Sequence, residues 1–411
     1  MPEISKALQK PLGKFFTREA ISDLLVSSLS IQDPQVVLDL GSGDGSLSKA
    51  AAKRWNNAKF ITVDIDNDTH LPNLLGNYSV SQHTHYKLDA LLPSLISDIG
   101  LSKEKIDLAL CNPPFIKPQW NEKHTEFLRQ AGFTESIVGI GSVTAEVLFV
   151  IQNLLSLREG GQLGLIIPDG FISGEKSRQF RSFILKSNSI DKVIKLPKNS
   201  FVGTNIQAHI VIITKGVSKD FIELSDFSKG YCTKTLHIQK EQAIDSLDIT
   251  YHSIFGSEQG KWITLSDIGC KISRGNYNSK QCRTSGLKIF HTVDIPVDKN
   301  QIEFDDEGNK EIIKSENKVY AKKGDILVAR VGRNLARQIC FVNKGEALIS
   351  DCIYRLDVPQ SWKMKVFHFL TSKKGYEVLT SMMRGTGASY LTSTMLLRLP
   401  LIGVRKKNHD K

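Results

Sequence analysis

Two patterns of apolar and polar positions alternate along the first half of the chain. Short runs of aliphatic and β-branched residues are typical of buried strands, and several of the stretches between them carry apolar side chains at helical spacing. The runs lie at 36–40, 60–64, 86–90, 106–111, 163–167, 190–196 and 208–214. Strands that alternate with helices predict an α/β fold built on a mainly parallel, doubly wound sheet.

The pattern changes after about residue 217. Lys, Asp, Ser and Glu become frequent and the periodicity weakens, which predicts a region that connects two domains. Further on, strand-like segments separated by Gly and Lys precede two helical stretches, at about 363–383 and 392–398, and predict a compact α+β domain. The predicted organisation is a first domain, a connecting region, a second domain and a basic tail, at residues 1–217, 218–260, 261–403 and 404–411.

A glycine-rich turn follows the first predicted strand. Residues 36–47 read Val-Val-Leu-Asp-Leu-Gly-Ser-Gly-Asp-Gly-Ser-Leu, so that Asp39 precedes Gly41, Gly43 and Gly45. Glycine lets the backbone turn tightly and approach a ligand closely. The spacing differs from the dinucleotide fingerprint, and no phosphate-binding Lys-Ser/Thr pair follows it. The turn therefore predicts a ligand site of another kind at the end of this strand.

Acidic residues stand at the ends of the next two predicted strands. Asp64 comes about 20 residues after the glycines, where a carboxylate commonly binds ribose hydroxyls, and Asp66 is the alternative. Asp89 follows the third strand. A carboxylate in a solvated loop is the simpler interpretation of each.

The fourth strand ends in Asn112, Pro113, Pro114 and Phe115. Two prolines cannot continue a sheet ladder or enter a helix interior, so the strand stops there and presents the Asn112 amide. Open α/β sheets bind ligands at the carboxyl ends of their strands. This segment offers an amide, a rigid carbonyl and an aromatic ring, which together suit a planar base that carries an exocyclic amine. The alternative is that the segment is only a turn.

The glycine-rich turn and the Asn-Pro-Pro-Phe segment together resemble the amino-methyltransferases, which methylate the exocyclic nitrogen of adenine or cytosine in DNA. Asn at the first position of the segment is typical of the N6-adenine enzymes. The resemblance implies a Rossmann-like fold, S-adenosylmethionine as cofactor and no metal. The residues expected to hold the cofactor are Asp39, Gly41, Gly43, Asp64, Asp89 and Asn112, and those expected at the reacting amine are Asn112, Pro113, Pro114 and Phe115.

Two aromatic segments add to this resemblance. In gamma-class enzymes a Phe-Phe-Thr segment contacts the methionine part of the cofactor, which here implies Phe15, Phe16 and Thr17. The segment that begins at Phe201 resembles the target-base loop of the family, where an aromatic ring flanks the flipped base opposite Phe115. Ordinary core packing is the alternative for Phe201.

The second domain is similar to one half of a type I restriction specificity subunit, which is a DNA target-recognition domain. The likeness covers about 140 residues and rests on the order of loose motifs. Arg330 and Arg333, in its Gly- and Lys-rich loops, are candidates to contact phosphates and guanine edges. Ordinary surface charge is the alternative for each.

Composition adds few limits to this interpretation. The net charge of +11 suits a polyanionic partner, and double-stranded DNA is the expected one. The six cysteines form no CxxC pair, which argues against a zinc site or a disulfide framework. Without an apolar run of membrane length or a leader, the chain is expected in the cytoplasm, away from any membrane.

The sequence predicts an adenine-specific DNA methyltransferase of a restriction-modification or defence system. Methylation of RNA, of protein glutamine or of cytosine N4 stays open, as does a catalytically idle DNA-binding subunit. A homodimer and a partner restriction or defence subunit are both compatible with a single recognition domain.

Overall fold

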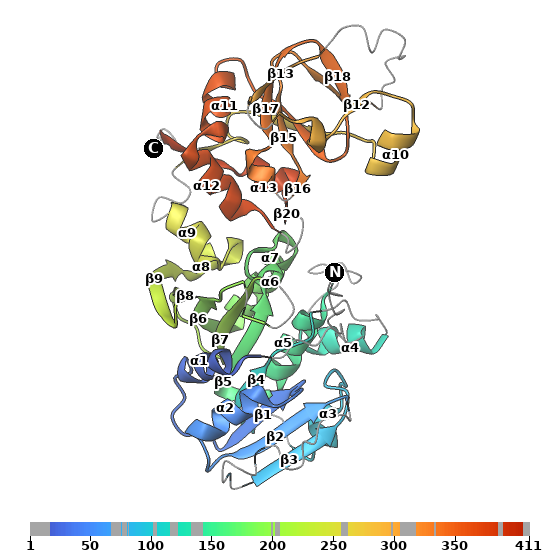
Figure 1. Ribbon diagram of the computed structural model, residues 1–411. Helices are drawn as coiled ribbons and strands as arrows, with labels where there is room; N and C mark the ends of the chain where they lie inside the picture. Colours follow the sequence, from blue (N-terminus) through green and yellow to red (C-terminus); the bar gives the residue numbers. More distant parts are fainter. Residues whose placement is uncertain are drawn as a thin grey trace, which may run out of the picture. The chain divides into compact units, whose positions relative to one another are not determined.

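Separate hydrophobic cores divide the chain into two units. In the computed structural model these are residues 1–249 and residues 250–411 (Figure 1). The structure describes residues 17–66, 75, 80, 82–101, 105–115, 122–132, 143–198, 200–201, 206–255, 262–296, 299–304, 318–332, 334–384 and 389–405. Among these residues, no helix is both long and apolar enough to cross a membrane.

One nine-stranded sheet forms the centre of the first unit. Its strands are β1 (Val36–Leu40), β2 (Lys59–Asp64), β3 (Gln82–Lys87), β4 (Ile106–Cys111), β5 (Leu157–Pro168), β6 (Asn188–Lys195), β7 (Ala208–Lys215), β8 (Phe221–Ser228) and β9 (Tyr231–Gln239). They lie in the order β3-β2-β1-β4-β5-β7-β6-β8-β9. The first five are parallel, whereas β7 is antiparallel to both of its neighbours and β9 is antiparallel to β8.

Helices cover both faces of this sheet, as the alternation in sequence predicts. They are α1 (Glu19–Ser27), α2 (Ser46–Arg54), α3 (Leu95–Asp98), α4 (Glu122–Gln130), α5 (Ala145–Ser156), α6 (Asp169–Ser173), α7 (Arg178–Ser187) and α8 (Lys240–Asp245). Successive side chains of a strand point to opposite faces, so Val37 packs in the cluster of α1 and α2 while Leu38 packs in that of α5. The α/β prediction is confirmed, with a mixed sheet.

The region predicted to connect two domains belongs to the first unit over most of its length. β8 and β9 extend the sheet beyond β6, and Ile222 and Leu224 of β8 are buried. The boundary between the two units lies after Ile249, within the range 218–260. The apolar periodicity is weak there because β9 is an edge strand that is exposed along most of its length.

The fully buried Arg181 holds this extension against the helices. Its guanidinium donates hydrogen bonds to the carbonyls of Phe171 and Gly174 near α6, and to those of Ile244 and Asp245 in α8. A buried charge is tolerated when its donors are satisfied in this way. Arg181 thus ties the segment after β9 to the rest of the unit.

The second unit is an α+β arrangement of short strands and helices. Its strands are β10 (Trp262–Thr264), β11 (Lys271–Arg274), β12 (Ile289–Phe290), β13 (Gln301–Glu303), β14 (Tyr320–Lys322), β15 (Ile326–Ala329), β16 (Val331–Gly332), β17 (Ile339–Lys344), β18 (Glu346–Ile349), β19 (Ile353–Asp357), β20 (Ser389–Tyr390) and β21 (Pro400–Arg405). The largest sheet has the order β11-β19-β15-β17-β13. Its helices, with α9 at the boundary of the units, are α9 (Ile249–Phe255), α10 (Ser279–Thr284), α11 (Lys363–Thr371), α12 (Lys373–Met382) and α13 (Ser393–Leu397).

The helix predicted at 363–383 is in fact two helices. Ser372 separates α11 from α12, and its hydroxyl accepts a hydrogen bond from the Gly375 amide at 3.0 Å. A serine at this position satisfies one of the amides that a helix start leaves without a partner. The helix predicted at 392–398 corresponds to α13.

Replacing Arg181 with leucine is expected to lower the free energy of unfolding of the first unit by about 3–5 kcal/mol. The change leaves buried carbonyls without donors, and such losses are among the largest that single substitutions cause. Arg178→Ala is the matched control, because its ion pair with Asp245 is partly exposed and is worth about 0–1 kcal/mol. Urea unfolding measures both, and equal losses would contradict the role given to Arg181.

Candidate active site

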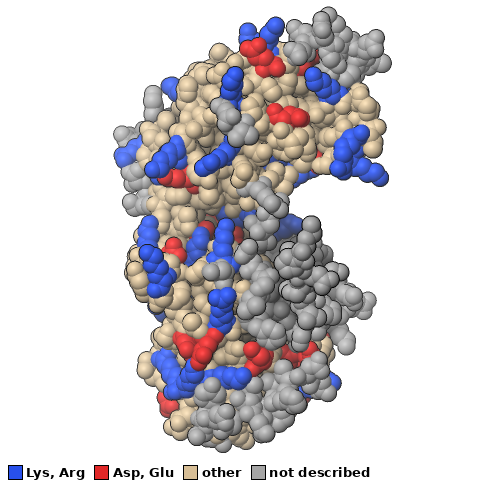
Figure 2. Space-filling model, in the orientation of Figure 1, with Lys and Arg blue, Asp and Glu red and all other residues tan. Residues whose placement is uncertain are grey.

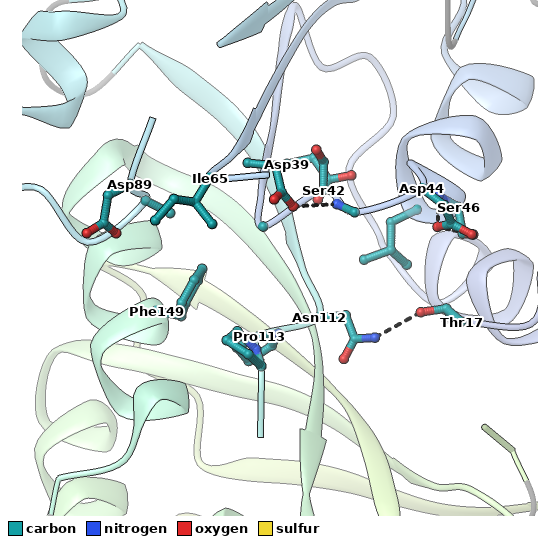
Figure 3. Close-up of a pocket in the computed structure, with 16 residues that line it drawn as sticks. Thr17, Asp39, Ser42, Asp44, Ser46, Ile65, Asp89, Asn112, Pro113 and Phe149 are labelled. Carbon is teal, nitrogen blue, oxygen red and sulfur yellow. Dashed lines mark hydrogen bonds between the residues drawn. The ribbon is translucent and has the colours of Figure 1, made fainter. Parts of the chain in front are cut away.

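A pocket opens where β1, β2 and β4 end in the first unit (Figure 3). It encloses about 880 Å³ of empty space, which includes its open mouth. Its lining residues are Thr17, Asp39, Gly41, Ser42, Gly43, Asp44, Ser46, Leu47, Asp64, Ile65, Asp89, Ala90, Asn112, Pro113, Pro114 and Phe149. Most of the residues that the sequence predicted for cofactor and amine therefore lie together.

The glycine-rich turn forms one wall of the pocket. Gly41 has a φ of +72°, a conformation that favours glycine, and its amide donates to the Val63 carbonyl at 2.8 Å. A Cβ atom added there would lie 3.3 Å from the Phe149 ring. Glycine at this position keeps the space between the turn and α5 open.

Asp64 supports this turn from the end of β2. Its carboxylate accepts hydrogen bonds from the Gly43 amide at 2.8 Å and from the Asp66 amide at 2.9 Å, and the residue is buried. Asp66, the alternative in sequence, does not line the pocket. The structure thus shows a bracing contact for Asp64 that the sequence did not predict.

Asp39 contributes a buried carboxylate to the pocket wall. Its Oδ2 accepts a hydrogen bond from the Ser48 hydroxyl at 2.6 Å, whereas its Oδ1 has no partner among the described residues. Desolvation by burial raises the pKa of Asp39 to about 7; the Ser48 hydrogen bond lowers it, and the nearby Asp64 raises it further. A ligand that offers a donor or a positive charge would satisfy this oxygen.

Apolar and acidic side chains lie at one end of the pocket. In Figure 3, Asp89, Ile65 and Phe149 lie at the end opposite Thr17 and Ser46. Ile65 is 54% exposed although it is aliphatic. Neither Ile65 nor Phe149 was predicted from the sequence. The position after an acidic strand end could have indicated Ile65, but an apolar residue within an apolar helix carries no such signal.

Asn112 faces the other end of the pocket. Its Nδ2 donates a hydrogen bond to the Thr17 hydroxyl at 2.9 Å, which orients the amide (Figure 3). Pro113 is buried beside it, and Pro114 also lines the pocket. Thr17 is further joined to Phe201 by an antiparallel bridge. Three segments far apart in sequence therefore meet at this corner.

The rings of Phe115 and Phe201 meet edge to face rather than in parallel. Their centroids are 6.4 Å apart at an interplanar angle of 82°, and Phe201 is only 2% exposed. Phe201 packs in the core, which was the alternative in sequence. In this conformation the two rings do not form a parallel slot that a base could enter.

The remaining predicted residues lie elsewhere. Phe15, Phe16 and Arg333 lie outside the described residues. Arg330 belongs to the second unit, where its Nε donates to the Asp351 carbonyl at 2.7 Å.

Fold and pocket together fit the class of Rossmann-like methyltransferases that the sequence resembles. A model of the N-6 DNA methylase family matches residues 1–286, and the chain belongs to this family.

Individual relatives are more distant. The chain is 29% identical over 198 residues to the type II methyltransferase M.BsuBI of Bacillus subtilis, covering 44% of this chain and 38% of that one. It is 24% identical over 313 residues to the type I restriction enzyme MpnII methylase subunit of Mycoplasma pneumoniae, covering 70% and 58%. The solved type IIG restriction endonuclease BpuSI has a TM-score of 0.49 at 14% identity, covering 94% and 58%. The chain spans less than two thirds of the length of each of these proteins.

Binding of S-adenosylmethionine is expected to tighten about five- to tenfold between pH 6 and pH 7.5. The ligand is a cation, so it favours the ionised form of Asp39, and the ionised fraction grows as the pH rises through a pKa of about 7. Calorimetry across this pH range measures the effect. Asp39→Asn should remove the pH dependence, and the exposed Asp98→Asn should keep it. A dependence that persists in Asp39→Asn would assign it to another group.

Proposed function

We propose that this protein is a site-specific DNA methyltransferase that transfers a methyl group from S-adenosylmethionine to the N6 amine of adenine in duplex DNA, within a restriction-modification or defence system. The observation that carries the proposal is the corner of Asn112 and Pro113 in the pocket wall, opposite the glycine-rich turn (Figure 3). Membership of the N-6 DNA methylase family supports the same reaction.

The pocket fits the cofactor that the family implies. S-adenosylmethionine supplies an activated methyl group when it is bound. Ile65 and Phe149 offer apolar surface for its adenine ring, with Asp89 nearby to accept from an amine. The Oδ1 of Asp39, which has no partner among the described residues, and the Thr17 hydroxyl suit its polar amino-acid end.

Asn112 and Pro113 then act on the amine of the target base. The side-chain oxygen of Asn112 and the carbonyl oxygen of Pro113 accept the two amine hydrogens. This contact draws the nitrogen lone pair out of conjugation with the ring and makes it more nucleophilic. The Thr17 hydroxyl accepts from the amide nitrogen of Asn112 and so sets the orientation of this side chain. Orientation of this kind is a large part of catalysis when the electrophile is already activated.

An adenine within a duplex must leave the stack to reach this corner. Unstacking costs a few kcal/mol, and stacking on an aromatic ring returns about 1–3 kcal/mol. Phe115 is the proposed platform. Phe201, buried behind it, supports the Phe115 ring through their edge contact.

The second unit is the proposed target-recognition domain. Its α+β arrangement agrees with the resemblance to one half of a type I specificity subunit. Arg330 donates a hydrogen bond to the Asp351 carbonyl, which suits a structural role better than base readout. Arg333 remains a candidate to contact DNA.

A transfer assay with labelled S-adenosylmethionine tests the function. Duplex DNA, RNA and protein are offered separately, and the modified nucleoside is identified by mass spectrometry. N6-methyladenine in duplex DNA is expected. Label in RNA or in protein glutamine, or N4-methylcytosine in DNA, would replace the proposal, and no transfer at all would favour an idle DNA-binding subunit.

Asn112→Ala is expected to lower the turnover rate by about 100-fold or more, because an acceptor for the amine is lost. Thr17→Val removes the hydrogen bond that orients the amide but keeps the Asn112 acceptor, so it should cause a smaller loss of the single-turnover rate at saturating cofactor. Single-turnover kinetics measure both, and calorimetry should show cofactor binding largely unchanged in Asn112→Ala. Wild-type turnover in that variant would exclude the mechanism.

Phe115→Ala is expected to impair methylation of a paired adenine more than that of a mismatched one. A mismatched base costs less free energy to extrude from the duplex. Its methylation therefore depends less on the stacking free energy that the base gains on the Phe115 ring. The ratio of kcat/KM for the two duplexes measures the difference. An equal loss on both would show that Phe115 does not act in base extrusion.

A further inference from the structure

The net positive charge of the chain lies entirely in the second unit. Residues 250–411 contain 27 Lys and Arg against 16 Asp and Glu, whereas residues 1–249 contain 27 of each. A polyanion bound by this protein would therefore be attracted to the second unit. Basic side chains that are not engaged within the second unit are the ones that could contact it.

Several arginines of the second unit are engaged in contacts within it. Arg330 donates to Asp351. Arg337 lies over the Tyr376 ring at 5.3 Å, and the buried Arg384 donates to the carbonyls of Ser381 and Met383. These contacts suit a role in stabilising the fold of the unit better than a role in binding a polyanion.

A short helix, α10, presents a different group of basic residues. None of its residues is buried, and it projects from the body of the second unit (Figure 1). Residues 274–288 around it contain Lys280, Arg283 and Lys288, together with Arg274, which pairs with Asp351, and no acidic residue. Figure 2 shows Lys and Arg side chains gathered at this place. Neither Lys280 nor Arg283 forms an ion pair with a described residue.

The projection is held firmly although it buries nothing. The Asn278 side chain accepts from the Lys280 and Gln281 backbone amides, and the Asn278 backbone amide donates to the Gln281 side-chain oxygen. The backbone amide of Asp351 donates to the Tyr277 carbonyl at 2.9 Å. The start of α10 is therefore fixed to the segment between β18 and β19.

The same segment fixes a second exposed feature. The His291 ring is hydrogen-bonded to the Ser350 hydroxyl at 2.7 Å, and a 3₁₀ turn, Thr292–Asp294, follows it. Gln338 donates to the Thr292 carbonyl, which braces the turn. At its centre Val293 is 82% exposed. A single exposed valine is common on protein surfaces. Val293, however, is held by the same segment between β18 and β19 that holds the basic helix α10.

We infer that α10 and the Thr292–Asp294 turn form the surface by which the second unit contacts duplex DNA. Lys280, Arg283 and Lys288 neutralise phosphates and set the position of the duplex. Val293 makes apolar contact with base edges, such as the methyl group of thymine. This inference rests on the proposed function and names the part of the recognition unit that performs it.

The salt dependence of DNA binding tests the phosphate contacts. Fluorescence anisotropy with the whole chain measures the affinity for an unmethylated duplex that contains the sequence methylated by the wild type. The measurement is repeated at several salt concentrations. Lys280→Ala combined with Arg283→Ala should weaken binding and reduce the slope of log K against log salt by about 2. Lys373→Ala combined with Lys374→Ala removes the same charge from α12 and should leave the slope unchanged.

Competition with a duplex of scrambled sequence tests the apolar contact. Val293→Ser should lower the preference for the methylated site about tenfold and leave the salt slope unchanged. Because α10 and Val293 bury little, thermal unfolding should match that of the wild type in all these variants.

Three results separate the inference from the function on which it rests. If the wild type methylates DNA while the α10 variant keeps the wild-type affinity and slope, the surface is wrong and the function stands. If the wild type neither binds nor methylates duplex DNA, the function itself fails. If α10 governs binding to RNA in preference to duplex DNA, the surface is assigned to the wrong partner.

Discussion

The parallel hydrogen-bond register around β1 determines where the pocket of the first unit lies. Leu38 of β1 pairs with Ile61 of β2 and with Ala109 of β4, so the three strands end at the same edge of the sheet. The turn after β1 then folds onto the end of β2 through the Val63 carbonyl and the Asp64 carboxylate. Residues that are far apart in sequence line one pocket because of this register.

Polar groups at this edge are set in place before any ligand arrives. Asp64 is committed to the glycine turn and Asn112 is oriented by Thr17. Asp39 is the exception, because one of its oxygens is buried without a partner among the described residues. Burial of a bare carboxylate is costly, and a raised pKa is the usual outcome. The pocket therefore favours a ligand that brings a donor or a positive charge to that oxygen.

Much of the first unit could be predicted from sequence because parallel strands that are buried on both faces consist of consecutive apolar residues. β1, β4 and β5 are of this kind. β3 and β9 lie at the two edges of the sheet and carry polar side chains, so their positions were shifted or missed.

The candidate site shows the same division. Asp39, Gly41 and Asn112 stand at strand ends, where spacing along the chain indicates position in space. Phe149 comes from a helix with no distinguishing pattern, and only the fold brings it to the glycine turn. The contact of Arg330 with Asp351 likewise depends on tertiary structure, so sequence composition suggested a free side chain where there is a bonded one.

The β8–β9 extension determines where the first unit can be cut. A chain that ended at residue 217 would leave β6 as the outermost strand, with its backbone amides and carbonyls open on one side. Such an edge is a template for strand pairing between molecules, which leads to aggregation. Lys234 and His237 on β9 are the kind of polar side chains that discourage this pairing on the intact edge. A version of the first unit that keeps β6 covered therefore reaches to the end of α8, past the point at which its sequence stops resembling a sheet.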